Sequence, residues 1–232
     1  PNSDLDSYFI GTGKQFTILN VFKRTATGFV QEGLIGNLSG ANRSVMVQMA
    51  SDVVKLQQRV GGANKNLTGT RTLTNTDIYY RVAIIVDGVT PANNKIIINK
   101  VEDTLSSNAL TGVSDSSTGD YAIGNIGVGV VAGIDQEQSQ LSIIDRCLTV
   151  SEVEDWDNDG FPKNPQTLFD ANCVYLFNPD DSGSTAQFSV VDSVNGITAT
   201  SVNMVDADKL TDTPYILSPI SNRFDNNFIN SL

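Results

Sequence analysis

Apolar and polar residues alternate with a period of two through most of this 232-residue chain. Between residues 79 and 86, one set of alternate positions is consistently apolar and comprises Tyr80, Val82, Ile84 and Val86. The segments 44–49 and 54–60 repeat the pattern. Because successive side chains of a strand point to opposite faces of a sheet, this period predicts strands with one well-buried face.

Further strands are expected wherever the pattern recurs, at 14–23, 30–36, 95–100, 121–126, 138–145, 172–178 and 187–191. Clusters of Gly, Asn, Asp and Ser separate them, and we expect loops at 61–68, 90–94 and 106–120. Many short strands with hardly any helix predict an all-β chain folded as a two-sheet antiparallel jelly-roll sandwich. A chain of this length fits one such domain.

One short helix is predicted near 150–157. The sequence from Thr149 to Glu152 has the form of a capping box, in which the threonine hydroxyl and the glutamate carboxylate satisfy free amides at the helix start. Val153 and Trp156 are three residues apart and face one side, which assigns the tryptophan to the core. Gly160, followed by a proline, ends the helix.

The stretch 140–160, which contains this helix, resembles the signature of the laminin-G-like, concanavalin A-like jelly-roll family. That signature is a strand, an Asp-Arg-x-Leu-Thr turn, a short helix and a closing glycine. The matching positions are Asp145, Arg146, Leu148, Thr149, Glu152, Val153 and Gly160. Segments 16–23, 79–88, 95–99 and 121–124 are similar to other strands of the family and follow in the same order, so the resemblance covers about residues 8–178.

The chain departs from the family pattern in two places. The acidic pair that often precedes the signature strand is Ser139-Gln140 here, so no role of that acid is carried over. Segments 173–178 and 190–196 resemble the strand and turn that normally open such a domain, yet they follow the helix. We therefore expect a circularly permuted single domain over 1–218, in which 172–205 completes the sandwich, and a tail or arm at 219–232.

Charge restricts the partners. The chain has 15 Lys and Arg against 26 Asp and Glu, which gives a net charge of −11 and a pI near 4.3. Nucleic acid and anionic membrane surfaces require clustered basic residues, so neither is expected as a partner. No apolar run in the sequence is long enough to span a membrane. No signal peptide is visible, and we expect synthesis in a cytoplasm.

The sequence offers little for catalysis. It contains no histidine, and Cys147 and Cys173 lie in apolar contexts typical of buried free thiols. Glycan-cleaving sandwiches carry carboxylates at alternate strand positions. Asp135 and Glu137 satisfy that spacing, but Ser139 stands where a third acid would be. We therefore predict a non-enzymatic protein with no catalytic residues and no cofactor.

Asp155, Asp157 and Asp159, followed by Gly160, imitate the start of a calcium-binding loop. The glutamate that should close such a loop is replaced by Gln166. The alternative is that the three aspartates form the solvated end of the predicted helix. We predict no metal site, and leave open whether these aspartates hold calcium.

Glycan binding by such sandwiches uses exposed aromatic rings together with Asn and Asp side chains. The candidate rings are Tyr79, Tyr80, Tyr121 and Phe29, although core or sheet-surface positions explain each of them equally. The sequence therefore nominates no carbohydrate-binding residues.

Three functions from different classes remain. We expect a non-enzymatic structural or interaction module on a virion surface, as a decoration, fibre or tail protein, because jelly rolls resembling this one are frequent there. Its partners would be other structural proteins of the assembly or further copies of itself. The alternative is a lectin-like module for cell-surface glycans, and a glycoside hydrolase is the third. Extracellular display fits the first two.

Overall fold

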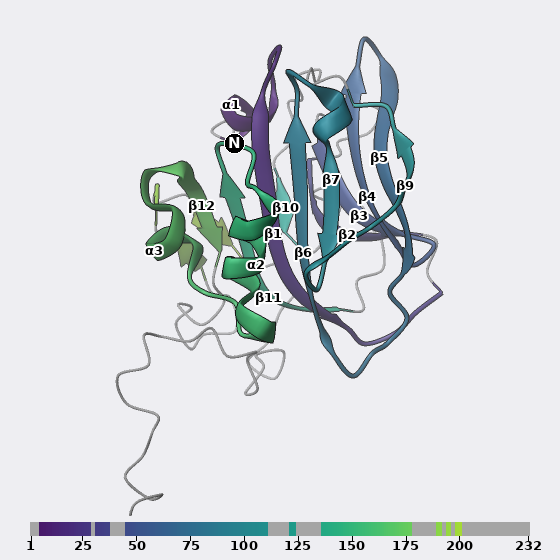
Figure 1. Ribbon diagram of the computed structural model, residues 1–232, viewed down its shortest axis with the longest axis vertical. Coiled ribbons are helices and arrows are strands. Elements are labelled where there is room, and N and C mark those ends of the chain that lie inside the picture. The colour runs from purple at the N-terminus through teal and green to yellow at the C-terminus, as the bar shows by residue number, and fades with distance from the viewer. Residues whose placement is uncertain are drawn as a thin grey trace, which may run out of the picture.

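The computed structural model describes residues 5–28, 31–37, 45–110, 121–123, 136–177, 189–191, 194–195 and 198–200. Two six-stranded antiparallel sheets face each other, as Figure 1 shows. The predicted all-β, two-sheet sandwich is therefore confirmed.

Sheet A has the strand order β12-β11-β1-β6-β7-β8. Its strands are β1 (Gln15–Arg24), β6 (Tyr79–Asp87), β7 (Lys95–Ile98), β8 (Val101–Glu102), β11 (Gln136–Ile144) and β12 (Cys173–Phe177). Sheet B has the order β10-β2-β3-β4-β5-β9. Its strands are β2 (Glu32–Gly36), β3 (Val45–Ala50), β4 (Val53–Val60), β5 (Ala63–Thr72), β9 (Leu105–Asn108) and β10 (Ala122–Ile123).

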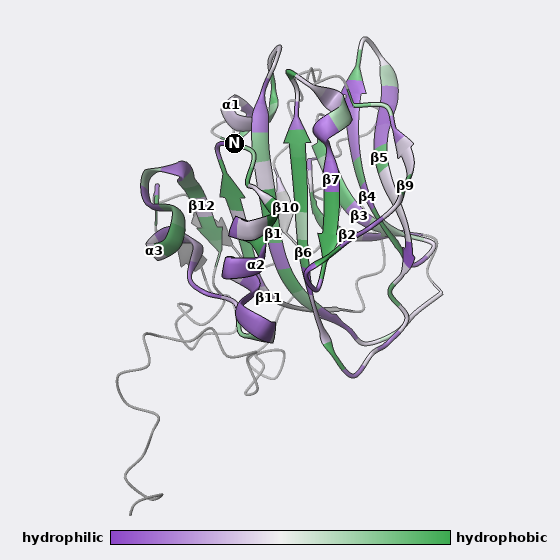
Figure 2. Cartoon of the chain, viewed as in Figure 1, coloured by the Kyte–Doolittle hydropathy of each residue, from purple (hydrophilic) through white to green (hydrophobic). Residues whose placement is uncertain are grey.

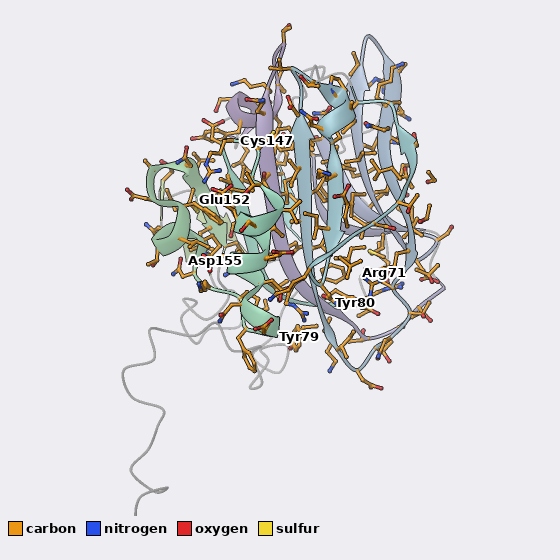
Figure 3. All side chains as sticks on the ribbon, in the orientation of Figure 1. Arg71, Tyr79, Tyr80, Cys147, Glu152 and Asp155 are labelled. Atoms are coloured by element: carbon orange, nitrogen blue, oxygen red, sulfur yellow. The ribbon has the colours of Figure 1, made fainter. Side chains whose placement is uncertain are left out.

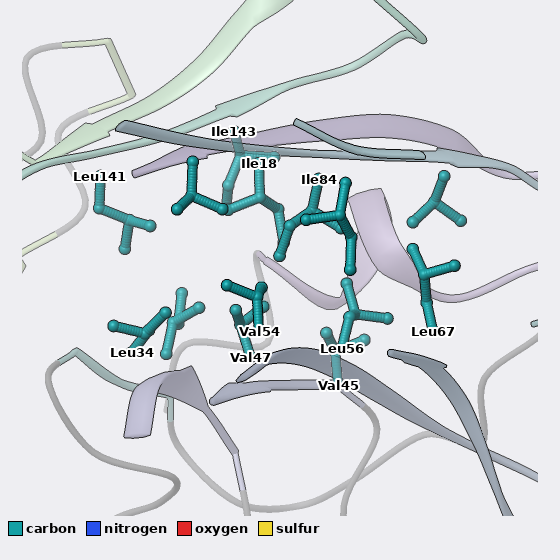
Figure 4. Close-up of a cluster of buried hydrophobic side chains, with 14 of the residues drawn as sticks. Ile18, Leu34, Val45, Val47, Val54, Leu56, Leu67, Ile84, Leu141 and Ile143 are labelled. Atoms are coloured by element: carbon teal, nitrogen blue, oxygen red, sulfur yellow. The ribbon is translucent and has the colours of Figure 1, made fainter. Parts of the chain in front are cut away.

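The main hydrophobic core lies between the two sheets. Figure 4 shows Ile18, Ile84 and Ile143 of sheet A opposite side chains of sheet B. The sheet B residues include Val45, Val47, Val54, Leu56 and Leu67. Nearly all of these residues occupy the apolar positions of the period-two pattern, so the alternation in the sequence places the core.

Tight turns connect three pairs of neighbouring strands. The two turn residues have positive φ in each case: 50° and 65° at Ser51-Asp52, 57° and 79° at Gly61-Gly62, and 50° and 67° at Asn99-Lys100. Two consecutive left-handed residues form the turn whose twist matches that of a β-hairpin. The glycines adopt this backbone without steric cost.

The expected loop at 61–68 is wrong, because only its first two residues form a turn and β5 begins at Ala63. Within that range a single apolar side chain, Leu67, faces the core. A strand with one solvent-facing side needs few apolar residues, so composition alone hides it. The expected loop at 106–120 also begins within a strand, β9.

The short helix predicted near 150–157 is confirmed as α2 (Val150–Asp157), with both hydrogen bonds of the capping box. The structure adds helical turns that the sequence analysis missed: α1 (Asp6–Phe9), η1 (Pro91–Asn93), η2 (Asn158–Gly160), α3 (Pro165–Phe169) and η3 (Asp170–Asn172). A signal for α3 exists, since Asn164 caps it and a proline occupies its first position. No helix of the described residues is long and apolar enough to cross a membrane.

The C-terminal segments relate to the sandwich in two ways. β12 pairs with β11 and forms an edge of sheet A. β13 (Ser189–Val191) and β14 (Thr198–Thr200) pair with each other in a separate two-stranded sheet. Asn195 lies between β13 and β14 in the chain, and its side-chain amide donates to the backbone carbonyl of Val174 in β12. Residues 201–232, including the predicted tail at 219–232, lie outside the described residues, and the single domain over 1–218 stays a prediction.

Candidate functional site

A second hydrophobic layer covers the outer face of sheet A. Residues 145–172 leave the end of β11 and return across that face with α2 and α3, as Figure 1 shows. In Figure 2, β6 is hydrophobic along most of its length, whereas α2 contains many hydrophilic residues. The layer joins Leu19, Val21, Ala83, Ile85, Ile97 and Ile144 of the sheet to Val153, Trp156 and Phe169 above it.

Thr17 of β1 attaches this covering layer to the sheet. Its side chain is fully buried. The hydroxyl donates to the carbonyl of Arg146 at 2.9 Å and accepts from the backbone amide of Leu148 at 3.0 Å. The side chain of Thr17 therefore makes two hydrogen bonds to the turn that resembles the family signature.

Arg146 and Glu152 lock the beginning of α2. The two guanidinium nitrogens donate to the two carboxylate oxygens at 2.7 and 3.0 Å. The hydrogen bonds from this guanidinium lower the pKa of Glu152 to about 2, helped by bonds from the backbone and hydroxyl of Thr149. Arg146 also lies over the ring of Phe169 at 5.7 Å. These contacts give the signature residues a structural role.

Trp156 is fully buried, as predicted. Its indole N–H donates at 3.1 Å to the side-chain oxygen of Gln140, one of the two residues that replace the acidic pair of the family pattern. At this position the chain uses a neutral amide as the partner of its tryptophan.

The three aspartates that imitate a calcium loop each contact a different basic residue. Asp155 pairs with Lys163, Asp157 with Arg81 and Asp159 with Lys100. The Lys100 ammonium lowers the pKa of Asp159. Among the residues that the structure describes, no group of three or more His, Cys, Asp or Glu side chains is placed to hold a metal ion. The carboxylates thus point to separate protein cations.

The other candidates from the sequence do not form one site. Asp135 lies outside the described residues, and Glu137 lies on β11, where its backbone pairs with that of Lys23. The thiol of Cys173 is buried, and that of Cys147 is half-buried and donates to the carbonyl of Val86 at 3.3 Å. Burial raises the pKa of Cys147 to about 11, which keeps the thiol protonated at neutral pH.

The candidate aromatic rings are also dispersed. Tyr80 is buried between the sheets, where its ring lies 5.9 Å from that of Phe22. Tyr121 donates a hydrogen bond to Asp6 at 2.8 Å. Tyr79 is half-buried at the edge of the covering layer, below α2 in Figure 3, and Lys23 lies over its ring. Phe29 lies outside the described residues.

The outer face of sheet B differs from that of sheet A, since its side chains on β4 and β5 are polar. We call this surface the polar face. Its residues alternate with the core positions of the two strands and comprise Lys55, Gln57, Arg59, Asn64, Asn66 and Thr68. Five of these six side chains are half-buried or exposed, and Gln57 is 6% exposed.

Hydrogen bonds order the middle of the polar face. The Gln57 amide donates to the Asn66 side-chain oxygen at 2.8 Å across the β4–β5 pair. The Ser107 hydroxyl of β9 donates to the Asn66 carbonyl at 3.3 Å. The result is an array of amide, hydroxyl and cationic groups on two paired strands. Sequence analysis missed it because 61–68 was expected to be a loop, although Gly61-Gly62 between two alternating segments is a hairpin signal.

Comparison with known proteins gives fold likenesses alone. No family model and no curated protein matches the chain. Among solved structures, a heptameric SAP-like pentraxin from Limulus polyphemus is 16% identical with a TM-score of 0.42, covering 61% of this chain and 68% of that one. The binding domain of Paraclostridial Mosquitocidal Protein 1 is 15% identical with a TM-score of 0.48, covering 64% and 38%.

Botulinum neurotoxin type C, whose cell entry depends on interaction with two ganglioside molecules, is 11% identical with a TM-score of 0.48. It covers 84% of this chain and 49% of that one. This chain therefore spans about half or less of the two toxin chains. Likenesses at this level carry no argument about its function.

Proposed function

We propose that this chain is a non-enzymatic binding module, a lectin-like sandwich of the laminin-G-like, concanavalin A-like kind, which binds glycans through the polar face. The observation that carries the proposal is the difference between the outer faces of the two sheets. The outer face of sheet A is covered by its own helical layer, whereas the polar face presents hydrogen-bonding groups from β4 and β5.

The chemistry of the polar face suits a sugar. Glycans present many hydroxyl groups, each able to donate and accept, and side-chain amides such as those of Asn64 and Asn66 also do both. Neighbouring strands lie about 4.8 Å apart and alternate residues of one strand about 6.6 Å apart, so the groups form a regular array. Because backbone pairing holds the array, a ligand orders few side chains on binding.

The proposal also includes where the protein is displayed. We propose display on a virion or another extracellular surface, with structural proteins of that assembly or further copies of the chain as partners. A net charge of −11 favours solubility of the chain. Immunogold labelling of purified particles tests this part: label on the particle surface supports it, and label absent from intact particles contradicts it.

A glycan array, probed with and without calcium, tests the binding function. We expect the wild-type chain to retain at least one glycan in both conditions, and the double variant Asn66→Ala/Thr68→Ala to bind it at least tenfold more weakly. Thr167→Ala, an exposed change on α3, is the matched control and should bind like wild type. Failure of the wild-type chain to bind any glycan, or equal binding by the double variant, contradicts the proposal.

A further inference from the structure

Three outward side chains of β5 form a straight row on the polar face. Asn64, Asn66 and Thr68 occupy alternate positions of the strand, and all three are half-buried or exposed. Alternate residues of a strand lie about 6.6 Å apart, so the row is about 13 Å long. Its side chains are amides and a hydroxyl, with no charged group and no aromatic ring. The row therefore offers a ligand hydrogen bonds and no ionic attraction.

The row ends at Thr68, because the strand changes there. The pairing of β5 with β9 shifts register between Thr68 and Gly69. A Cβ atom at Gly69 would lie 2.1 Å from a carboxylate oxygen of Asp103, so this position has no room for a side chain. The backbone amide and the hydroxyl of Thr70 both donate to the same carboxylate, at 3.1 and 3.2 Å. Beyond Thr68, the strand therefore holds Asp103 and adds no further position to the row.

Hydrogen bonds within the protein fix the direction in which the row is available. Across the strands, Gln57 of β4 donates to the Asn66 side-chain oxygen at 2.8 Å, and Ser107 of β9 donates to the Asn66 carbonyl at 3.3 Å. Along β5, no hydrogen bond to another described residue engages the side chains of Asn64 and Thr68. Asn66 retains its side-chain N–H donors, since the bond from Gln57 uses the oxygen. Within the described part of the chain, the groups left for a ligand therefore follow β5.

From this geometry we infer that the polar face binds a linear, neutral polysaccharide lengthwise along β5, through at least two consecutive sugars, and not a single terminal sugar. The inference rests on the proposed function and adds the ligand class. One sugar ring is shorter than a row of about 13 Å, whereas a polysaccharide reaches Asn64, Asn66 and Thr68 together. A net charge of −11 disfavours an acidic polymer, so the ligand is neutral.

Oligosaccharides of increasing length test the inference. The probes are malto-, cello- and manno-oligosaccharides of one to six sugars, with galacturonate oligosaccharides of the same lengths as the acidic comparison. Isothermal titration calorimetry measures each affinity. We expect at least one neutral series to bind at least tenfold more tightly at three sugars than at one, and to change less than twofold between four and six. A monosaccharide bound as tightly as its hexasaccharide overturns the inference, and so do galacturonate oligosaccharides bound as tightly as the neutral ones.

Variants at the two ends of the row locate the ligand. Asn64→Ala and Thr68→Ala each remove one end, and we expect each to weaken hexasaccharide binding about three- to tenfold and to abolish the gain between two and three sugars. Thr68→Ser keeps the hydroxyl and should bind like wild type, which separates a lost contact from a lost fold. Thr167→Ala on α3 is the control and should change binding less than twofold. Unchanged length dependence in both alanine variants, or a serine variant as weak as Thr68→Ala, overturns the assignment to the row.

The glycan array described above separates this inference from the proposed function. If the array retains glycans that share only a terminal sugar, and no oligosaccharide series shows the length dependence, the inference fails and the proposed function stands. If the wild-type chain binds no glycan on the array and no oligosaccharide, both fail.

Discussion

On sheet A, the residues that point away from the sandwich core are mostly apolar and lie beneath α2 and α3. On sheet B, the corresponding residues of β4 and β5 are polar, and most are accessible. Both sheets contribute one apolar face to the same core. The comparison shows that two sheets with the same inner face can differ outside: α2 and α3 cover sheet A, whereas the outward residues of β4 and β5 are polar and mostly accessible.

The free energy of burying apolar side chains explains why one outer face is covered and the other is not. Burying a large apolar side chain stabilises the folded state by about 1.5–3 kcal/mol relative to exposure. The apolar outer face of sheet A therefore requires a covering layer, which residues 145–172 provide through Trp156 and Phe169. Polar residues gain nothing comparable from burial, so β4 and β5 leave a face accessible to a ligand.

The largest effect is expected at the centre of the covering layer. Trp156→Ala should lower the free energy of unfolding by about 3–5 kcal/mol, because it removes a fully buried indole and its hydrogen bond to Gln140. Phe161→Ala is the aromatic control just beyond α2, where the ring is 48% exposed, and it should cost less than about 1 kcal/mol. Urea unfolding measures both. Similar losses of unfolding free energy in the two variants would mean that the covering layer does not act as a hydrophobic core.

The attachment of the layer by Thr17 is expected to contribute less. Thr17→Val preserves the shape of the side chain but leaves the amide of Leu148 and the carbonyl of Arg146 without their partner, at a cost of about 1–3 kcal/mol. Thr17→Ser retains the hydroxyl and should recover most of this loss in the same unfolding measurement. A serine variant as unstable as the valine variant would contradict the role of the hydroxyl.

A pH-dependent contribution is expected from Glu152. Its pKa in the folded protein is about 2, below the value of 4.5 for the free group, so folding favours the ionised form. The resulting stabilisation is fully present above about pH 4.5 and is lost as the pH falls toward 2. Because the side chain is 34% exposed, solvent screening reduces the contribution to about 1–2 kcal/mol.

Comparison of Glu152→Gln with wild type isolates the stabilisation that comes from the ionised carboxylate of Glu152. The variant should be less stable by that amount at pH 7 and nearly as stable as wild type near pH 2, in chemical unfolding at each pH. Glu154→Gln, at an exposed position of the same helix, is the control. A difference that persists unchanged at low pH would show that the Arg146 contact does not stabilise the charged form.

The smallest effect on stability is expected on the polar face. Thr68→Ala and Asn64→Ala should each change the free energy of unfolding by less than about 0.5 kcal/mol, because accessible polar side chains contribute little to the folded state. Thermal unfolding gives this value, and glycan affinity measured in parallel should fall. A large loss of stability would mean that these residues support the fold, and would remove the contrast between the two sheets.

Much of this architecture could be predicted from the sequence. Alternation placed β1, β3, β4, β6 and β11, since only a half-buried strand requires a period of two. The capping box located α2, because Thr149 and Glu152 interact within one helical turn. Both signals depend on neighbouring residues and need no knowledge of the fold.

The polar face could not be predicted in the same way. Residues 63–68 have few apolar side chains, and their composition is typical of a turn. Pairing with β4 turns Asn66 and Thr68 outward beside Gln57 and Lys55, and that pairing is a tertiary fact. The fate of Asp155, Asp157 and Asp159 was equally hidden, because two of their partners, Arg81 and Lys100, lie more than fifty residues away in the chain.

By itself, the sequence determined the class of the fold, the inward positions of most strands and the short helix, because these follow from local periodicity and from contacts within a turn. Only the tertiary structure decided which sheet is covered and which face collects the basic and amide side chains of β4 and β5. Those outcomes depend on pairings between residues distant in sequence, whose free energy exists only once the two sheets have come together.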